Sequence, residues 1–266
     1  MMKIKDMIQN AMDQGYQNDD ASAKVCQDII LKALSKSTLS RNATIKGGVV
    51  MRAKTNNARR ATKDLDIDFI KYSLADESIE LFIQKLNCLD GITIKKTGKI
   101  ETLRQQDYSG KRVYVMIEDS DGYQISSKID LGVHNRFEIE QEEYCFDLFR
   151  DDEGVSLLIN SNEQMFAEKL RSLLRLGPIS TRYKDVYDLY YLITVVDIEK
   201  LQPALNTYIF RDGVMREKES KDIIKRLEFT FRDKVYLRNL DMSDKRWIDD
   251  DIQTITGELL EFVRKL

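Results

Sequence analysis

The chain has 266 residues, 42% of them hydrophobic and 33% charged, with only two prolines and a formal net charge of −3. This composition excludes a disordered or collagen-like chain and is typical of a globular protein with long helices, large enough for one catalytic domain and a helical extension. Because acidic and basic residues nearly balance, the overall field does not steer the chain towards nucleic acid, so any polyanion site must be local.

The cysteines and the histidine exclude several kinds of site. Cys26, Cys88 and Cys145 are odd in number and far apart, and none forms a metal-type pair with another cysteine or with His134, the single histidine. The thiols therefore indicate a reducing compartment, and carboxylates must carry most of any catalysis. No apolar run approaches the roughly 18 residues that span a bilayer, and the N-terminus lacks a signal-type core. We expect a cytoplasmic protein that does not bind a membrane.

Two helices are expected at the start of the chain. Residues 3–15 and about 20–37 repeat apolar side chains with helical period. We interpret residues 1–40 as an N-terminal helical segment.

A strand-like stretch at 43–46 precedes two glycines. Gly47 and Gly48 break this strand, and the apolar run behind them predicts a short helix. Glycine lets the backbone approach a phosphate closely, and the first amides of the following helix would point at that phosphate. The pair therefore predicts a strand-to-helix turn suited to nucleotide binding.

The stretch DLDIDFI at 64–70 alternates acidic and apolar residues with strand period, which places Asp64, Asp66 and Asp68 on one face. One interpretation is an edge strand whose acids simply face water. The other is a metal site, because like charges at alternate positions repel one another and a cation offsets that repulsion. Carboxylate oxygens of this kind suit a pair of Mg²⁺ ions. For Asp68, one step further along, we expect a surface or supporting role.

The remaining pattern predicts a mixed fold. A helix is expected over 75–89, followed by strands over 92–96, 111–118, 123–133 and 143–149, and the sequence is helical from 161 almost to its end. We therefore expect an α+β protein with a mixed or mostly antiparallel sheet in residues 41–160 and a helical domain in residues 161–266.

A third acid lies in the 123–133 strand. Asp130 stands between Ile129 and Leu131 and on the opposite face from both. If this strand neighbours the 64–70 strand, Asp130 joins the acidic face; otherwise it is a solvent-facing acid.

These motifs together resemble a known family. Gly47, Gly48, Arg60, Thr62, Asp64 and Asp66 follow the order G-G…R-x-T-x-D-x-D, the Asp130 strand comes next, and AEKLRSLL at 167–174 and RYKDVYDLYYL at 182–192 complete the series. The pattern resembles the AbiEii/AbiGii toxin nucleotidyltransferases of the DNA polymerase beta superfamily. The resemblance implies a nucleotidyltransferase fold in which Asp64, Asp66 and Asp130 are catalytic and hold two Mg²⁺ ions.

The resemblance also implies a nucleotide site formed by Gly47, Gly48, Arg60 and Thr62. Arg60 could instead neutralise the nearby acids. The chain departs from the family pattern at Val49, where a small hydroxyl residue is common.

The helical motifs supply further nucleotide-binding candidates. Lys169 falls within an apolar helical stripe, so it either extends to solvent or, as the resemblance implies, reaches the phosphates of the nucleotide. Lys184, Asp185 and Asp188 share one helix face, and a surface pair of Lys184 with Asp188 is the simplest explanation. The resemblance implies instead that this polar face borders the active site.

The resemblance implies an enzyme that transfers a nucleoside monophosphate from a nucleoside triphosphate to an acceptor hydroxyl and releases pyrophosphate. It further implies a toxin paired with an antitoxin and acting on tRNA. Basic and aromatic residues between 208 and 236 are either the solvated face of amphipathic helices or a platform for an RNA acceptor. Two alternatives remain: a small-molecule nucleotidyltransferase of the antibiotic-modifying kind, and a nucleotide-binding regulatory module that has lost transfer.

Overall fold

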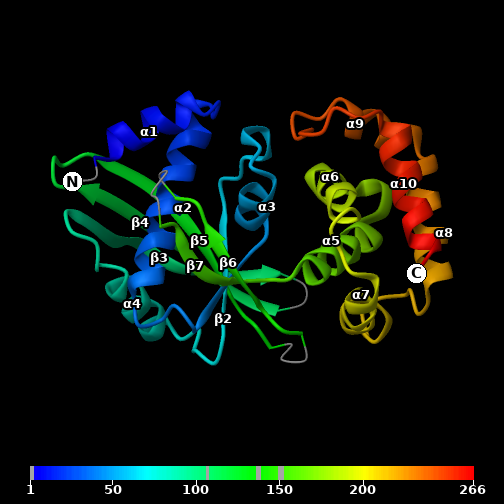
Figure 1. Ribbon diagram of the computed structural model, residues 1–266. Coiled ribbons are helices and arrows are strands. Elements are labelled where there is room, and N and C mark those ends of the chain that lie inside the picture. Colours follow the sequence, from blue (N-terminus) through cyan, green and yellow to red (C-terminus); the bar gives the residue numbers. More distant parts are fainter. Residues whose placement is uncertain (1–2, 106–107, 136–138, 149–152) are drawn as a thin grey trace. The chain divides into compact units, whose positions relative to one another are not determined.

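A computed structural model describes residues 3–105, 108–135, 139–148 and 153–266 (Figure 1). The chain divides into two compact units, Met1–Asn160 and Ser161–Leu266, each described here by itself. In the described part of the chain, no helix is long and apolar enough to cross a membrane.

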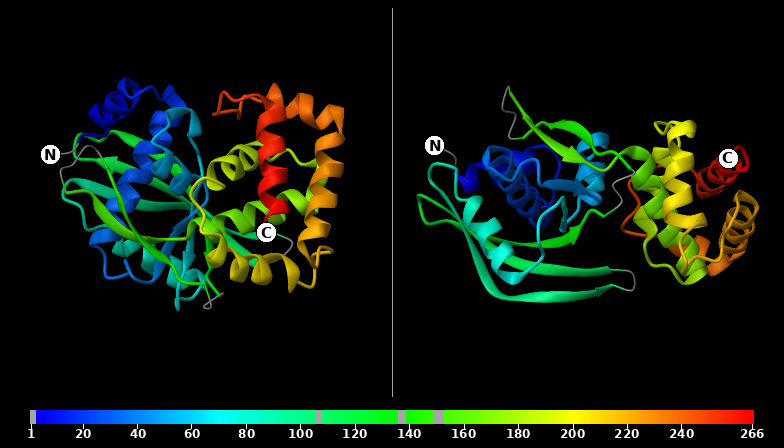
Figure 2. Two further views of the ribbon diagram at one scale, coloured as in Figure 1. Left: turned by 45° about the vertical axis from the view of Figure 1, so that its right-hand side comes forward. Right: turned by 90° about the horizontal axis from the view of Figure 1, so that it is seen from below.

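In the part of the chain that the structure describes, unit 1 contains a seven-stranded sheet in the order β3-β4-β5-β2-β1-β7-β6. Figure 2 shows unit 1 from two further sides. Strands β2 and β5 run parallel, as do β1 and β7, and the other neighbours are antiparallel. The expected mixed sheet is therefore confirmed. The elements are α1 (Ile4–Asp13), α2 (Asn18–Lys36), β1 (Ala43–Lys46), α3 (Gly48–Thr55), η1 (Ala58–Arg60), β2 (Leu65–Phe69), α4 (Asp76–Lys85), β3 (Ile92–Gln105), β4 (Tyr108–Asp119), β5 (Gln124–Val133), β6 (Glu142–Phe146) and β7 (Val155–Ile159).

The apolar face of β2 forms part of the core. Leu65, Ile67 and Phe69 are at most 1% exposed, and the Phe69 ring makes an edge contact with Phe82 of α4 at a centroid distance of 5.0 Å. The alternation of DLDIDFI therefore results from burial of one face, as the strand period predicts. The acids occupy the other face.

Helix α2 fixes the segments that flank β2. Asp28 of α2 forms a buried ion pair with Arg52 of α3 at 2.8 Å. The neighbouring Gln27 donates from Nε2 to the carbonyl oxygens of Thr62 and Asp64, at 2.8 and 3.4 Å. A buried charge and a buried amide need such partners, so these contacts fix α3 and the approach to β2 relative to α2.

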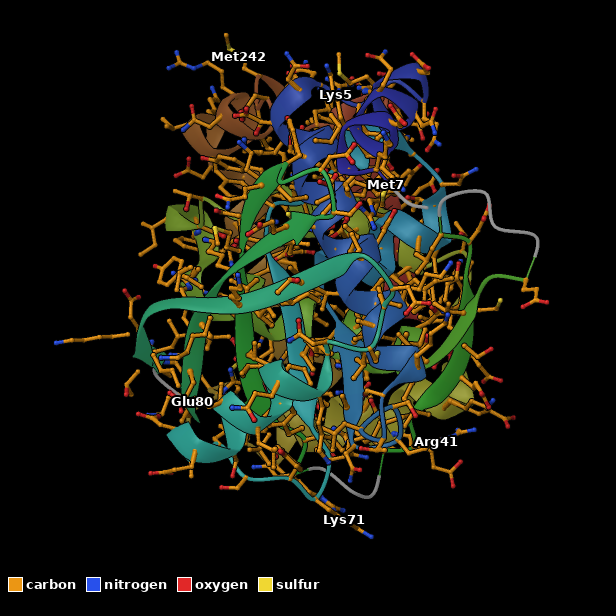
Figure 3. The ribbon with its side chains drawn as sticks, turned by 90° about the vertical axis from the view of Figure 1, so that its left-hand side faces the viewer. Lys5, Met7, Arg41, Lys71, Glu80 and Met242 are labelled. Carbon is orange, nitrogen blue, oxygen red and sulfur yellow. The ribbon has the colours of Figure 1, made fainter. Side chains whose placement is uncertain are left out.

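Helix α1 lies at the end of the sheet opposite Lys71, as the labelled Lys5 and Met7 show in Figure 3. It is attached through Asp119 at the end of β4, whose Oδ2 accepts from the backbone N–H of Ile4 at 2.9 Å. A carboxylate at a helix N-terminus satisfies an otherwise unpaired donor and complements the helix dipole.

Unit 2 is helical throughout, as expected from residue 161 onward. Its helices are α5 (Asn162–Leu176), η2 (Gly177–Ile179), α6 (Tyr183–Leu192), α7 (Ile198–Leu205), η3 (Asn206–Phe210), α8 (Ser220–Arg232), α9 (Lys234–Asp241) and α10 (Ile252–Arg264). Side-chain caps begin several of them; the Ser161 hydroxyl, for example, accepts from the Gln164 N–H at 3.1 Å. The helical pattern and the caps together define this unit.

The structure differs from the expected elements in two places. Strand β7 was not expected; it pairs with β1 and β6, and these two strands, β7 and β6, extend the sheet beyond β1. Strand β3 reaches Gln105 rather than ending near 96. The end of the expected 143–149 strand, Phe149, lies outside the described residues.

Candidate active site

Four charged residues occupy one row across the sheet of unit 1. The strand register pairs Lys46 with Asp66, Asp66 with Asp130, and Asp130 with Arg112. Registered residues of neighbouring strands project from the same face, with strands about 4.8 Å apart. Asp66 and Asp130 are therefore adjacent, with a cation on either side. The condition set by the sequence, that the two acidic strands be neighbours, is met.

Asp64 joins the same face from the residue before β2. Its Oδ1 lies 2.8 Å from Nζ of Lys128, which precedes Asp130 by two residues on β5. Asp68, two residues beyond Asp66, forms an ion pair with Lys46 at 2.7 Å. Asp68 is buried rather than at the surface, and its partner Lys46 belongs to the row.

Asp130 is held by a two-pronged contact with Arg112. The guanidinium Nε and Nη2 donate to Oδ1 and Oδ2 of Asp130, both at 2.7 Å. Short parallel hydrogen bonds of this kind are strong and fix both planes. The Asp130 carboxylate therefore has a set orientation.

Asp66 differs from its neighbours. Within the described ranges, its carboxylate makes no hydrogen bond or ion pair. Burial raises its pKa to about 6; the charge of Lys46 opposes this rise, and the charges of Asp130, Asp64 and Asp68 add to it. The centre of the acidic row is thus a carboxylate whose charge is poorly compensated.

The two glycines and the acidic strand form one packed unit. Gly47 has φ 66°, and a Cβ there would lie 2.6 Å from Oδ2 of Asp66. A Cβ on Gly48 would lie 2.6 Å from Oγ1 of Thr62. Only glycine fits at Gly47, for both reasons, and the motif G-G…T-x-D-x-D is explained by direct packing.

Two further residues of the motif are buried. Arg60, on η1, is 3% exposed. Val49, the departure from the family pattern, is fully buried in the core. Its side chain therefore serves packing, and phosphate contacts at this turn would come from backbone amides.

The carboxylates fit magnesium chemically, although no cage is assembled. Within the residues that the structure describes, no group of three acidic, histidine or cysteine side chains is arranged to hold a metal ion. The reason is visible: Asp64 and Asp130 are turned to Lys128 and Arg112. Three carboxylates on one sheet face, of which Asp66 makes no ion pair with any described residue, nevertheless match the preference of Mg²⁺ for hard oxygen ligands.

The predicted residues of unit 2 form a second charged cluster. Nζ of Lys169 lies 2.8 Å from Oδ1 of Asp185 and 2.6 Å from Oδ2 of Asp188. Asp188 is fully buried and also accepts from Nε1 of Trp247 at 3.1 Å. Lys169 therefore does not extend to solvent, and Asp188 is not part of a surface pair with Lys184; both of those interpretations are wrong.

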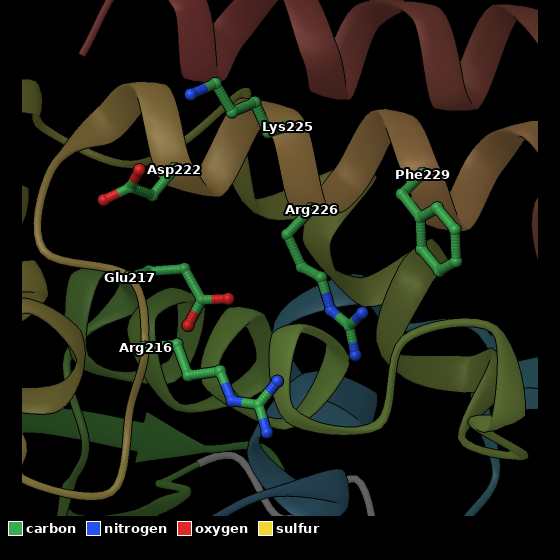
Figure 4. A pocket seen from close by; sticks show the side chains of 6 residues that line it. All are labelled: Arg216, Glu217, Asp222, Lys225, Arg226 and Phe229. Carbon is green, nitrogen blue, oxygen red and sulfur yellow. The ribbon is translucent and has the colours of Figure 1, made fainter.

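Unit 2 also carries a shallow pocket of about 310 Å³ beside α8 (Figure 4). Arg226 is fixed there by a hydrogen bond from Nε to the Leu174 carbonyl, at 2.9 Å, and by its contact with the Phe229 ring. Phe229 is 60% exposed. In the described part of the chain, the Arg216 side chain makes no hydrogen bond or ion pair. The pocket lies within the stretch 208–236 identified in the sequence, and the acidic side chains of Glu217 and Asp222 line it together with the basic ones and Phe229.

Comparison with known proteins gives a family match over most of the chain. The family of nucleotidyl transferase AbiEii toxins of type IV toxin–antitoxin systems matches residues 29–264. No curated protein matches the chain. Among solved structures, an antigenic nucleotidyltransferase-like protein from Paracoccidioides brasiliensis is 15% identical, with 70% of this chain and 86% of that chain covered and a TM-score of 0.42. The antibiotic-resistance factor ANT(2'')-Ia is also 15% identical, with 70% and 92% covered and a TM-score of 0.42.

Proposed function

The chain belongs to the AbiEii family of nucleotidyl transferase toxins, and from this membership we propose that it performs magnesium-dependent nucleotidyl transfer at the acidic row of unit 1. The observation that supports this site most is the register of Asp66 with Asp130 beside the Gly47 turn. A poorly compensated carboxylate flanked by two further acids is costly unless a cation binds there. Divalent cations supply that compensation.

In the proposed reaction, an acceptor hydroxyl attacks the α-phosphorus of a nucleoside triphosphate. The new phosphorus–oxygen bond forms as the bond to pyrophosphate breaks, and the hydroxyl proton leaves to solvent or a nearby base. Two Mg²⁺ ions held by Asp64, Asp66 and Asp130 would neutralise the phosphate charge and lower the pKa of the hydroxyl. The protein contributes positioning: Arg112 orients Asp130, and the Gly47 turn places Asp66.

We further propose that the nucleotide contacts the backbone at Gly47 and Gly48, with Arg60 and Thr62 supporting the turn. For unit 2, taken by itself, we propose that Lys169, Lys184, Asp185 and Asp188 are nucleotide-binding residues. The mutual pairing of Lys169 with two carboxylates gives this cluster a defined shape before any ligand binds.

The proposed acceptor is tRNA, and a cognate antitoxin is the proposed partner. The α8 pocket supports a nucleic-acid acceptor, because a fixed guanidinium beside an exposed aromatic ring suits a phosphate and a stacked base. We place the protein in the cytoplasm, where its three free cysteines remain reduced.

The test is transfer of label from each α-labelled nucleoside triphosphate to total tRNA, with Mg²⁺ or with EDTA. We expect labelled tRNA and released pyrophosphate only with Mg²⁺, and neither with Asp66→Asn. Label on hydroxylated small molecules but not on tRNA would favour the antibiotic-type alternative. Nucleotide binding without pyrophosphate release, whatever the acceptor, would favour the regulatory module.

A further inference from the structure

Lys128 and Arg112 neutralise two of the three acids in different ways. Lys128 makes a single contact of 2.8 Å to Asp64, and both side chains are partly open to solvent, 34% and 48% exposed. The Arg112 contact with Asp130 is double and more enclosed, with side chains 24% and 14% exposed. A single contact of a flexible, hydrated ammonium is weak, whereas a planar double contact is strong. Of the two, Lys128 is the cation that can leave.

Lys128 also lies on the same sheet face as Asp130, so after leaving Asp64 its ammonium group can still contact a bound triphosphate. It precedes Asp130 by two residues on β5, so both side chains project from the same face. Any triphosphate bound through ions at the acidic row therefore lies within range of its ammonium group. A lysine is a mobile point charge that can follow phosphate oxygens.

We propose that Lys128 is a place-holding cation, which neutralises Asp64 while no metal is bound and transfers to the triphosphate when metal and nucleotide bind together. This proposal rests on the proposed function. A metal ion that binds alone must displace Lys128 from Asp64, and it offers the Lys128 ammonium no other anion in return. A metal–nucleotide complex brings both the cation for Asp64 and an anion for Lys128, so Lys128 makes the binding of metal and nucleotide cooperative.

The first experiment measures Mn²⁺ binding to the full chain by electron paramagnetic resonance, with and without a non-hydrolysable nucleoside triphosphate. Lys128→Met removes the charge and keeps the stem. We expect it to bind Mn²⁺ alone about twofold to fivefold more tightly than the wild type, the range for loss of a competing surface ion pair. The tightening of Mn²⁺ binding by the nucleotide should be smaller in Lys128→Met than in the wild type.

The matched control is Lys111→Met. Lys111 lies on the neighbouring strand β4 and makes a similar single contact of 3.0 Å, but to Asp76. It should leave both Mn²⁺ constants unchanged. An equal gain in both variants would show a general effect of charge and would overturn the proposal.

The second experiment follows the lysine itself. Acylation of Lys128, measured by peptide mass spectrometry with Lys111 as the internal reference, should become faster with Mn²⁺ alone and slow again when the nucleotide analogue is added. Unchanged Lys128 reactivity while Mn²⁺ binds would overturn the place-holding role and leave the metal site intact. Failure of the wild type to bind Mn²⁺ at all, with or without nucleotide, would overturn the proposed function together with this inference.

Discussion

Asp66 and Asp130 are registered partners on the parallel strands β2 and β5. Of these two carboxylates, only that of Asp130 forms an ion pair with another described residue. The pairing of Asp130 with Arg112 leaves Asp66 as the centre of unbalanced charge, close against the Gly47 turn. The protein itself therefore neutralises part of the charge of the acidic row, and the poorly compensated charge lies at Asp66.

Asp66→Asn should stabilise the metal-free protein. Burial raises the pKa of Asp66 to about 6, so at pH 7.5 the folded state holds a charge that the unfolded state holds more easily. Removing this charge should raise the free energy of unfolding by roughly 1 to 3 kcal/mol. Urea unfolding in EDTA measures it, and Asp90→Asn, at an exposed acid, is the control. A loss of stability would show that the Asp66 charge is well compensated.

Magnesium binding should depend on pH through Asp66. Metal binds the deprotonated carboxylate, so affinity should be constant well above pH 6 and fall up to about tenfold per pH unit below it. The raised pKa has the opposite effect on stability: protonation of Asp66 stabilises the metal-free fold at low pH, and this contribution is lost as pH rises through about 6. Calorimetric titrations with Mg²⁺ from pH 5 to 8 would follow the first effect; a flat profile would contradict it.

Gly47→Ala should be far more harmful than Gly98→Ala. Both glycines have almost the same positive φ, 66° and 67°, so both alanines carry similar backbone strain of about 1 to 2 kcal/mol. At Gly98 nothing lies within 4 Å of the added carbon, whereas at Gly47 it meets the Asp66 carboxylate. Thermal melting and Mg²⁺ binding of the two variants distinguish the backbone strain, which both share, from the contact with Asp66, which only Gly47→Ala makes. Equal losses of stability and of Mg²⁺ affinity in both variants would show that the Asp66 side chain moves aside freely.

Most of the local structure could be predicted from the sequence, because burial of one face of β2 imposes a visible period of two. The strand order could not be predicted in this way. That Asp130 lies beside Asp66 depends on which strands pair, and no local pattern encodes it. For the same reason the Arg112 and Lys128 contacts were not foreseen. Strand β7 was missed because VSLLI is short and does not alternate, so its period does not separate strand from helix.

In unit 2 the sequence placed Lys169 correctly in an apolar helical stripe but not its partners. Asp185 and Asp188 come from the next helix, and Trp247 from a segment more than fifty residues further on. Such a cluster could be found only by knowing how α5 and α6 pack. The motif resemblance nevertheless pointed to all three charged residues.

Lys169→Ala should destabilise unit 2, in addition to any effect on nucleotide binding. It leaves the buried Asp188 without its cation, and breaking a buried pair costs about 3 to 5 kcal/mol. Lys200→Ala, at an exposed lysine of α7, should cost little. Differential scanning calorimetry compares them. If Lys169→Ala melted like the wild type and only raised the Michaelis constant for nucleotide, the cluster would be a ligand site rather than a structural one.

Phe229→Ala and Arg216→Ala should weaken binding of the acceptor and not of the nucleotide. Loss of base stacking on Phe229 should weaken acceptor binding about fivefold or more. Loss of Arg216 should make the affinity for tRNA less dependent on salt concentration, by about the slope expected for one phosphate contact. Fluorescence anisotropy with labelled tRNA at several salt concentrations measures both, with Lys200→Ala, at an exposed lysine outside residues 208–236, as the control. Unchanged tRNA binding in both variants would remove the α8 pocket from the acceptor site.

We propose that Asp64, Asp66 and Asp130 together hold the catalytic metals. Anomalous diffraction from crystals grown with Mn²⁺ and a non-hydrolysable nucleoside triphosphate locates the ions directly. We predict two manganese peaks on the acidic row, with Asp66 contacting both, Asp130 contacting one and Asp64 turned away from Lys128. Peaks at Asp185 and Asp188 instead, or a bound nucleotide with no manganese at the acidic row, would contradict it.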